Sequence, residues 1–230
     1  MVAFRLLSYN VRSLADDRRA LARVVRRCAP DVACIQESPR LFRWRSRCAA
    51  LSSDTGLWII GGGWPTGLLI LGSLRTRVLH VESGWLSVVP RRLQRGLTLA
   101  VLEIGGARLV VGDIHLDLYT EGRTRHASEI LRVLSRVRGA YDAPAVLAGD
   151  VNEETGGPAW GLFTARFRDA YVAAPHGGEL TFPARAPRRR IDAIFTDPAI
   201  EVRGCGVPDA PGIPRASDHR PVVADLTLHV

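Results

Sequence analysis

Short apolar runs that end in polar or turn residues dominate the hydrophobic pattern of this chain. Runs of this length, bounded by Gly, Pro, Asn or Asp, are typical of buried strands. One expected hairpin has its turn at Gly105-Gly106, and its second strand is followed directly by His115. We expect strands at residues 3–8, 32–35, 57–60, 68–71, 78–81, 97–104, 108–114, 145–148, 191–195, 200–205 and 222–228, with shorter, less regular runs at 167–172 and 180–183.

Fewer segments show the 3.6-residue spacing of an amphipathic helix. One helix should follow Asp16, a candidate N-cap, because apolar residues recur from Leu21 to Cys28 and Pro30 comes next. Further helices are expected at residues 41–51, 122–137 and 158–164. Residues 85–95 read as a loop that contains Pro90 and three arginines.

The order of these elements predicts an α/β fold with more strands than helices. Hairpins interrupt any simple alternation of strand and helix, which favours two mixed β-sheets packed face to face with helices outside. Residues 55–74 carry no charge and have the length of a membrane span, but six Gly residues and Pro65 interrupt them. We read them as two strands around a turn, and expect no membrane span and a single domain over residues 1–230.

Composition adds a basic charge to this picture. Apolar residues make up 47% of the chain, the formal net charge is +8, and all 31 basic residues are Arg. Arg suits a polyanionic partner because it forms planar, bidentate contacts with phosphate, but a GC-rich genome would produce the same bias. The four cysteines lack CxxC spacing and are expected to be buried thiols. No leader precedes the first strand, so we expect a cytoplasmic protein.

Two of the last strands begin with polar residues that desolvation would penalise unless they have a partner or a task. Asp192 opens one apolar run, and Asp218-His219 precedes another. If the strands are neighbours, Asp192 and His219 form a carboxylate–imidazole pair that fixes the tautomer and raises the basicity of the ring.

Other polar residues stand at strand ends in the same way. Glu37 follows a buried strand and is a candidate ligand for a divalent ion, although a single such carboxylate is usually an ordinary surface group. Asp150 and Asn152 are two residues apart, so in an extended segment both would point to one side. Taken alone, Gly-Asp-x-Asn is also a common turn, and a lone His such as His115 is usually structural.

The set as a whole resembles the endonuclease/exonuclease/phosphatase superfamily, which includes deoxyribonuclease I. The matching stretches occur in the family's order: residues 8–10 (SYN), 35–37 (IQE), 112–116 (GDIHL), 149–152 (GDVN), 190–192 (RID) and 217–221 (SDHRP). The resemblance implies a deoxyribonuclease I-like four-layer sandwich, in which two packed mixed sheets are flanked by helices.

The resemblance also implies roles in metal-dependent attack of water on a phosphate ester. Glu37, Asn10 and Asp218 would hold Mg²⁺ or Mn²⁺, directly or through water. His219, oriented by Asp192, would be the base or a phosphate-binding imidazolium, and Asp150 would position or deprotonate the water. Asn10, Asn152 and His115 would bind the phosphate, and Asn152 and His115 would also stabilise the transition state or assist the leaving group. The sequence leaves open which of Asp150 and His219 takes the proton.

Three functions remain open at this point. The first is a nuclease or other phosphodiesterase acting on DNA or RNA, by endonuclease or exonuclease cleavage. Its support is the site together with arginines in expected surface segments: Arg91, Arg92, Arg95, Arg123, Arg125, Arg188 and Arg189. The second is a phosphatase or phosphodiesterase acting on a small-molecule or lipid phosphate ester, which a compact chain with short loops favours. The third is a non-catalytic binding protein, which the complete set of site residues disfavours. We expect a monomer.

Overall fold

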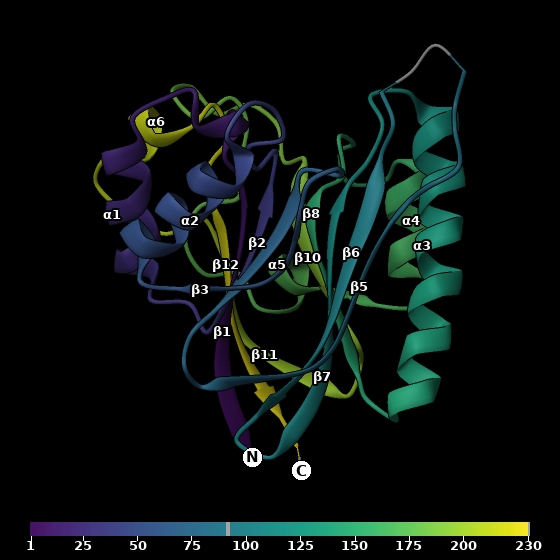
Figure 1. Ribbon diagram of the computed structural model, residues 1–230. Helices are drawn as coiled ribbons and strands as arrows, with labels where there is room; N and C mark the ends of the chain where they lie inside the picture. The colour runs from purple at the N-terminus through teal and green to yellow at the C-terminus, as the bar shows by residue number, and fades with distance from the viewer. Residues whose placement is uncertain (91–92, 230) are drawn as a thin grey trace.

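The computed structural model describes residues 1–90 and 93–229. Two six-stranded mixed sheets pack face to face, and helices cover the outer face of each (Figure 1). The predicted four-layer α/β sandwich is therefore confirmed. Arg91 and Arg92, two of the arginines in the expected loop, lie outside the described residues.

The first sheet has the strand order β11-β12-β1-β2-β4-β3. Its only parallel pair among the described strands is β1 with β2, and the pairing runs from Leu6↔Val32 to Asn10↔Gln36. Both strands therefore end at the same edge of the sheet. The bounds are β1 Val2–Asn10, β2 Val32–Gln36, β3 Trp58–Gly63, β4 Leu68–Gly72, β11 Ile200–Gly206 and β12 Val222–Leu228.

The second sheet has the order β5-β6-β7-β8-β10-β9 and repeats this feature. Strands β7 and β8 are parallel, and the pairing ends at His115↔Asp150. The carboxyl ends of both parallel pairs lie at one pole of the sandwich, remote from the N- and C-termini (Figure 1). The bounds are β5 Thr76–Trp85, β6 Gly96–Ile104, β7 Ala107–His115, β8 Ala145–Asp150, β9 Arg168–Asp169 and β10 Asp192–Thr196.

The helices divide between the two outer faces (Figure 1). Helices α1, α2 and α6 cover the first sheet, and α3 and α4 cover the second. The bounds are η1 Arg12–Leu14, α1 Arg18–Cys28, α2 Trp44–Thr55, α3 Thr120–Tyr141, α4 Pro158–Thr164, α5 Ala170–Ala173 and α6 Ile213–Ala216.

Three apolar layers hold the sandwich together, because each sheet buries both faces. Strand β2 illustrates this: Cys34 packs between the sheets, whereas Ala33 and Ile35 face α1 and α2. On the other side, Trp160 and Phe163 of α4 pack against the second sheet. Strands buried on both faces read as continuous apolar runs, which is why their positions could be predicted.

Several predicted boundaries were wrong. The N-cap of α1 is Asp17, whose carboxylate accepts from the Ala20 backbone N–H at 2.9 Å, rather than Asp16. Helix α2 starts at Trp44 instead of residue 41, since the preceding Arg43 has a left-handed φ of 58°. Strand β5 runs from Thr76 to Trp85, far beyond 78–81.

The two irregular runs form little regular structure. Residues 167–172 divide into the two-residue β9 and the short α5. Residues 180–183 form only an isolated bridge, Phe182↔Arg189.

Two further expectations concern residues 55–74 and the cysteines. The uncharged stretch forms β3 and β4 around a turn, as predicted, and no helix in the described part of the chain is long and apolar enough to cross a membrane. All four cysteines are buried and unpaired. Burial raises the pKa of the Cys28 thiol to about 11, so this side chain stays protonated at neutral pH.

Candidate active site

Asn10 connects the two sheets at the pole where the parallel strands end. It is the last residue of β1, and its amide Nδ2 donates to Glu37 Oε1 at 3.2 Å and to Asp150 Oδ2 at 3.0 Å. Glu37 directly follows β2 in the first sheet, and Asp150 ends β8 in the second. One buried amide therefore brings together side chains that the sequence places 140 residues apart.

His115 and Asp150 lie side by side at the ends of β7 and β8. The register pairs them directly, and His115 Nε2 is 3.4 Å from Asp150 Oδ2. The other oxygen of Asp150 accepts from the Asn152 backbone N–H at 2.9 Å. Both Asp150 oxygens thus have polar neighbours, although the side chain is almost completely buried.

Asn152 does not continue the strand. Strand β8 ends at Asp150 and Asn152 has a φ of 53°, so the expected extended segment was wrong. The reason is the tight turn after Asp150, in which the Asn152 amide Nδ2 donates to the Leu116 carbonyl at 3.0 Å. This bond holds the amide beside the residue that follows His115.

His219 pairs with Asp192 across the sandwich. Nδ1 lies 2.9 and 3.1 Å from the two Asp192 oxygens, and Nε2 is 3.7 Å from Asp150 Oδ2. The expected carboxylate–imidazole pair is therefore present, but β10 and β12 belong to different sheets, so the two residues meet across the sandwich and not between adjacent strands of one sheet. The ring of Phe182 packs against the imidazole with 4.8 Å between centroids.

The buried carboxylates at this pole influence the protonation states of His219 and Asp150. Burial alone would lower the pKa of His219, but Asp192, Asp150 and Asp218 outweigh it and raise the pKa to about 9. Burial, with the Asp192 charge, raises the pKa of Asp150 to about 7.

His115 responds in the opposite sense. Burial, and then the charges of Arg95, His219 and Arg40, hold its pKa well below the usual range. At neutral pH the pole therefore contains a charged His219 beside a neutral His115, two imidazoles with different hydrogen-bonding abilities.

A family model supplies the identification. The model of the endonuclease/exonuclease/phosphatase family matches residues 7–219. The chain belongs to the endonuclease/exonuclease/phosphatase family. A search of curated proteins finds no match.

Solved structures of other proteins share the deoxyribonuclease I-like fold of this family. An endonuclease/exonuclease/phosphatase from Bacteroides vulgatus is 22% identical, with 100% of both chains covered and a TM-score of 0.84. A mannosyl-6-phosphatase from Bacteroides thetaiotaomicron VPI-5482 is 19% identical, with 98% of this chain and 100% of that chain covered and a TM-score of 0.86. The human Nocturnin catalytic domain with bound sulfate anion is 17% identical, with 99% and 94% covered and a TM-score of 0.76.

The donor set at this pole suits the divalent ion that the family implies. The buried carboxylates of Asp150 and Asp192 have oxygens within 4.8 Å of each other beside His219, and the Glu37 carboxylate is joined to Asp150 through Asn10. Carboxylate oxygens are ligands that hard ions such as Mg²⁺ and Mn²⁺ prefer. The Asn10 amide oxygen instead accepts from the Arg12 backbone N–H at 3.1 Å.

Asp218 stands apart from the other expected metal ligands. Its carboxylate is 37% exposed, with Oδ2 3.5 Å from Arg12 Nε and Oδ1 3.4 Å from the Ser217 hydroxyl. No described contact joins it to Glu37 or Asn10. Ser217 itself donates to the Asn10 carbonyl at 2.7 Å, so it fixes the end of β1 and is not part of a serine triad.

Two residues that support the site were not predicted from the sequence. Thr181 is buried, and its hydroxyl accepts from the backbone N–H groups of Ile191 and Asp192, which fixes the start of β10. Phe182 supports the His219 ring. Both lie in an irregular segment with no periodic signal, so nothing in the sequence pattern connects them to β10 or β12.

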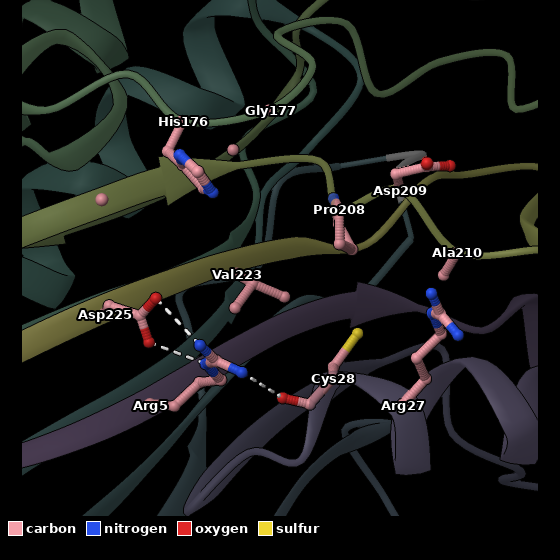
Figure 2. A pocket seen from close by; sticks show the side chains of 12 residues that line it. Arg5, Arg27, Cys28, His176, Gly177, Pro208, Asp209, Ala210, Val223 and Asp225 are labelled. Carbon is pink, nitrogen blue, oxygen red and sulfur yellow. Dashed lines mark hydrogen bonds and ion pairs between the residues drawn. The ribbon is translucent and has the colours of Figure 1, made fainter.

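A pocket of about 310 Å³ lies elsewhere on the first sheet, between the end of α1 and β11 (Figure 2). The Arg5 guanidinium in it donates to both Asp225 oxygens, at 2.7 and 2.9 Å, and to the Cys28 carbonyl at 3.0 Å. Its central charges therefore already neutralise each other. None of the candidate site residues lines this pocket.

Proposed function

We propose that this protein is a divalent-metal-dependent phosphate ester hydrolase whose catalytic domain spans residues 1–230. The observation that supports this most directly is the Asn10 amide, which joins Glu37 to Asp150 beside the His219–Asp192 pair. An acidic metal site, a charged imidazole and a carboxyl group with a pKa near 7 thus lie within reach of a single phosphate.

In this mechanism Glu37 would hold the metal ion, with Asp218 as an outer ligand through water, and the Asn10 amide would position the Glu37 carboxylate beside Asp150. The bound ion would neutralise charge on the phosphate oxygens. Water attacks phosphorus in line with the departing oxygen, and no covalent enzyme intermediate forms. A P–O bond to water forms while the ester P–O bond breaks.

The pKa values of the two candidate bases favour Asp150. A pKa of about 7 lets its carboxylate accept the proton of the attacking water near neutral pH. His219, with a pKa of about 9, would already be protonated and would bind the phosphate as an imidazolium. Asn152 and the neutral His115 would stabilise the transition state or assist the leaving oxygen.

The ion pairs that several arginines already form favour a small phosphate ester as substrate. Three of the arginines expected to contact nucleic acid are already paired: Arg123 with Glu153, Arg125 with Glu129 and Arg189 with Glu154. A guanidinium that is ion-paired with a carboxylate is less available to bind a phosphate backbone. The structural similarity to a mannosyl-6-phosphatase over nearly the full length of both chains supports the same substrate class.

Nucleic acid is the second candidate. The net charge of +8 favours it, as does an aromatic surface at the same pole. There Trp44 and Trp64 stack with 6.5 Å between centroids, and the Arg45 guanidinium lies 4.6 Å from the Trp44 ring. Stacked aromatics with arginines are a common platform for single-stranded DNA or RNA.

A hydrolysis panel tests both candidates. Plasmid, single-stranded DNA, RNA, nucleotides and sugar phosphates are incubated with Mg²⁺, with Mn²⁺ and with chelator. We expect metal-dependent release of phosphate from small esters, lost in His219→Ala and in Glu37→Gln and retained in Asp54→Asn, a surface control whose carboxylate pairs with Arg18. Cleavage of polymers alone would favour the second candidate, and no hydrolysis with either metal would refute the proposal.

A further inference from the structure

Two arginines stand beside the catalytic pole on opposite sheets. Arg95 immediately precedes β6, and extending the β6–β7 register from Leu97↔Ile114 places it across from Leu116, next to His115. Arg40 follows Glu37 in the loop after β2. Its aliphatic stem lies against Gly67, where an added Cβ would be 2.6 Å from Arg40 Cδ.

The loop that carries Gly67 connects the two positions. A Cβ added to Gly96 would be 2.4 Å from Thr66 Cγ2, so the turn between β3 and β4 presses directly on the start of β6. Arg40 and Arg95 therefore flank one contact between the sheets.

Neither guanidinium is neutralised by a direct partner. No ion pair or side-chain hydrogen bond joins Arg40 or Arg95 to another side chain in residues 1–90 and 93–229, and the half-buried Arg95 has a buried Nε without a hydrogen-bond partner. Many other arginines of the chain form ion pairs, such as Arg5 with Asp225. An unsatisfied buried donor carries a free-energy cost unless a ligand completes it.

The two arginines also act electrostatically on the site. Burial lowers the pKa of Arg95, opposed by the nearby carboxylates of Asp150, Asp117 and Glu37. The positive charges of Arg95 and Arg40 both help to depress the pKa of His115. A phosphate that contacts His115 would thus lie in the field of both guanidinium groups.

We propose that Arg40 and Arg95 form a clamp for a phosphoryl group with two negative charges, which makes the preferred substrates phosphomonoesters. The proposal rests on the hydrolase function above and names its substrate class. Above a second pKa of about 6, a phosphomonoester is a dianion with three terminal oxygens, whereas a phosphodiester carries one charge shared by two terminal oxygens. Guanidinium groups match phosphate oxygens in charge and in bidentate geometry.

The test compares two small substrates that share a leaving group. We measure kcat/KM for p-nitrophenyl phosphate and bis(p-nitrophenyl) phosphate with Mg²⁺ at pH 7.5, in wild type, Arg95→Gln and Arg40→Gln. We expect wild type to prefer the monoester. Each variant should lose about tenfold or more on the monoester, because a charged hydrogen bond is lost, and much less on the diester.

Arg132→Gln is the matched control, since Arg132 is exposed on α3 and has no ion pair among the described residues. It removes the same charge and should leave the substrate ratio unchanged. Arg95→Lys should recover part of the monoester activity, because charge returns without the planar donor pair. Equal losses on both substrates, or a wild-type preference for the diester, would overturn the clamp.

A binding experiment separates this proposal from the proposed function. The rise in Tm caused by inorganic phosphate, with Mg²⁺ present, needs no turnover. We expect the rise in wild type and Arg132→Gln, and its loss in Arg95→Gln and Arg40→Gln. Phosphate-dependent stabilisation without hydrolysis would support the clamp and refute the hydrolase, whereas an equal rise in wild type and Arg95→Gln would refute the clamp.

Discussion

At the scale of single residues, one carboxylate contributes most to the charge of the central imidazole. His219 is buried, which by itself disfavours the charged ring, yet its pKa is raised to about 9. Asp192 is the strongest of the opposing influences and accepts from Nδ1 at 2.9 Å. This pairing keeps Nε2 directed at Asp150.

Replacing Asp192 by Asn should therefore lower the pKa of His219. The amide keeps the shape of the carboxyl group but removes the charge that stabilises the imidazolium. An NMR titration of the histidine rings measures this directly, and hydrolysis should fall by about 100-fold or more as orientation and charge are lost. The surface variant Asp54→Asn should change neither, and an unshifted His219 would show that Asp192 does not control its charge.

The residues whose positions the sequence predicted best are those at the ends of buried strands. Asn10, His115, Asp150 and Asp192 each end or begin an apolar run, so their position at a sheet edge followed from the pattern. The Asp192–His219 pair was also predicted, but its position between two sheets was not, because no local rule connects strands of different sheets. Arg95 was expected as a surface residue, and only the β6–β7 register places it beside His115.

At the scale of elements, β8 can hold Asp150 in place only because a glycine precedes it. Gly149 has a φ of 156°, and a Cβ there would lie 1.9 Å from the Ile114 carbonyl oxygen of β7. The two strands thus approach more closely than any other residue permits. This close approach sets the His115–Asp150 spacing.

Gly149→Ala should separate β7 from β8. We expect a loss of roughly 1–3 kcal/mol in the free energy of unfolding, as for other buried steric insertions, and a fall in activity as Asp150 moves. Urea denaturation measures the first and the hydrolysis assay the second. Gly139→Ala is the control, since its Cβ meets nothing within 4 Å in α3 and should stabilise the helix by up to about 1 kcal/mol. Equal stabilities of the two variants would contradict this account of β8.

Element boundaries were predictable only where the sequence of the segment itself determines them. Strands β4, β8 and β10 are apolar runs between polar residues and came out close to their true limits. Strand β5 did not, because its exposed polar half is fixed by pairing with β6, which is information outside the segment. The start of α2 depends on one left-handed residue, Arg43, whose identity gives no such signal.

At the scale of the whole molecule, assembling this pole places two groups in protonation states that the unfolded chain would not adopt. Asp150 has a folded pKa of about 7 against an ordinary value of 3.8. His219 has about 9 against 6.5. Above these ordinary values the folded protein holds more protons than the unfolded chain, so both groups make stability decrease as pH rises.

The metal-free protein should therefore lose stability between pH 5 and pH 9. The Asp150 contribution declines from about pH 4 up to 7, and the His219 contribution is fully present below pH 6.5 and is lost as pH rises through 9. Urea denaturation in chelator at pH 5, 7 and 9 measures the trend. The double variant Asp150→Asn/His219→Gln should show a flatter profile, and a wild-type profile that rises towards pH 9 would refute the assigned charges.

The pairing of the first and last strands has a practical consequence. Val2 pairs with Leu228, so the two chain ends meet at the pole opposite Asp150 (Figure 1). A short linker could join them, and new ends could be opened in the turn at Gly105-Gly106 between β6 and β7. Such a circular permutant should keep the catalytic pole intact, and a carrier or surface attached at either original end would leave the substrate's approach unobstructed.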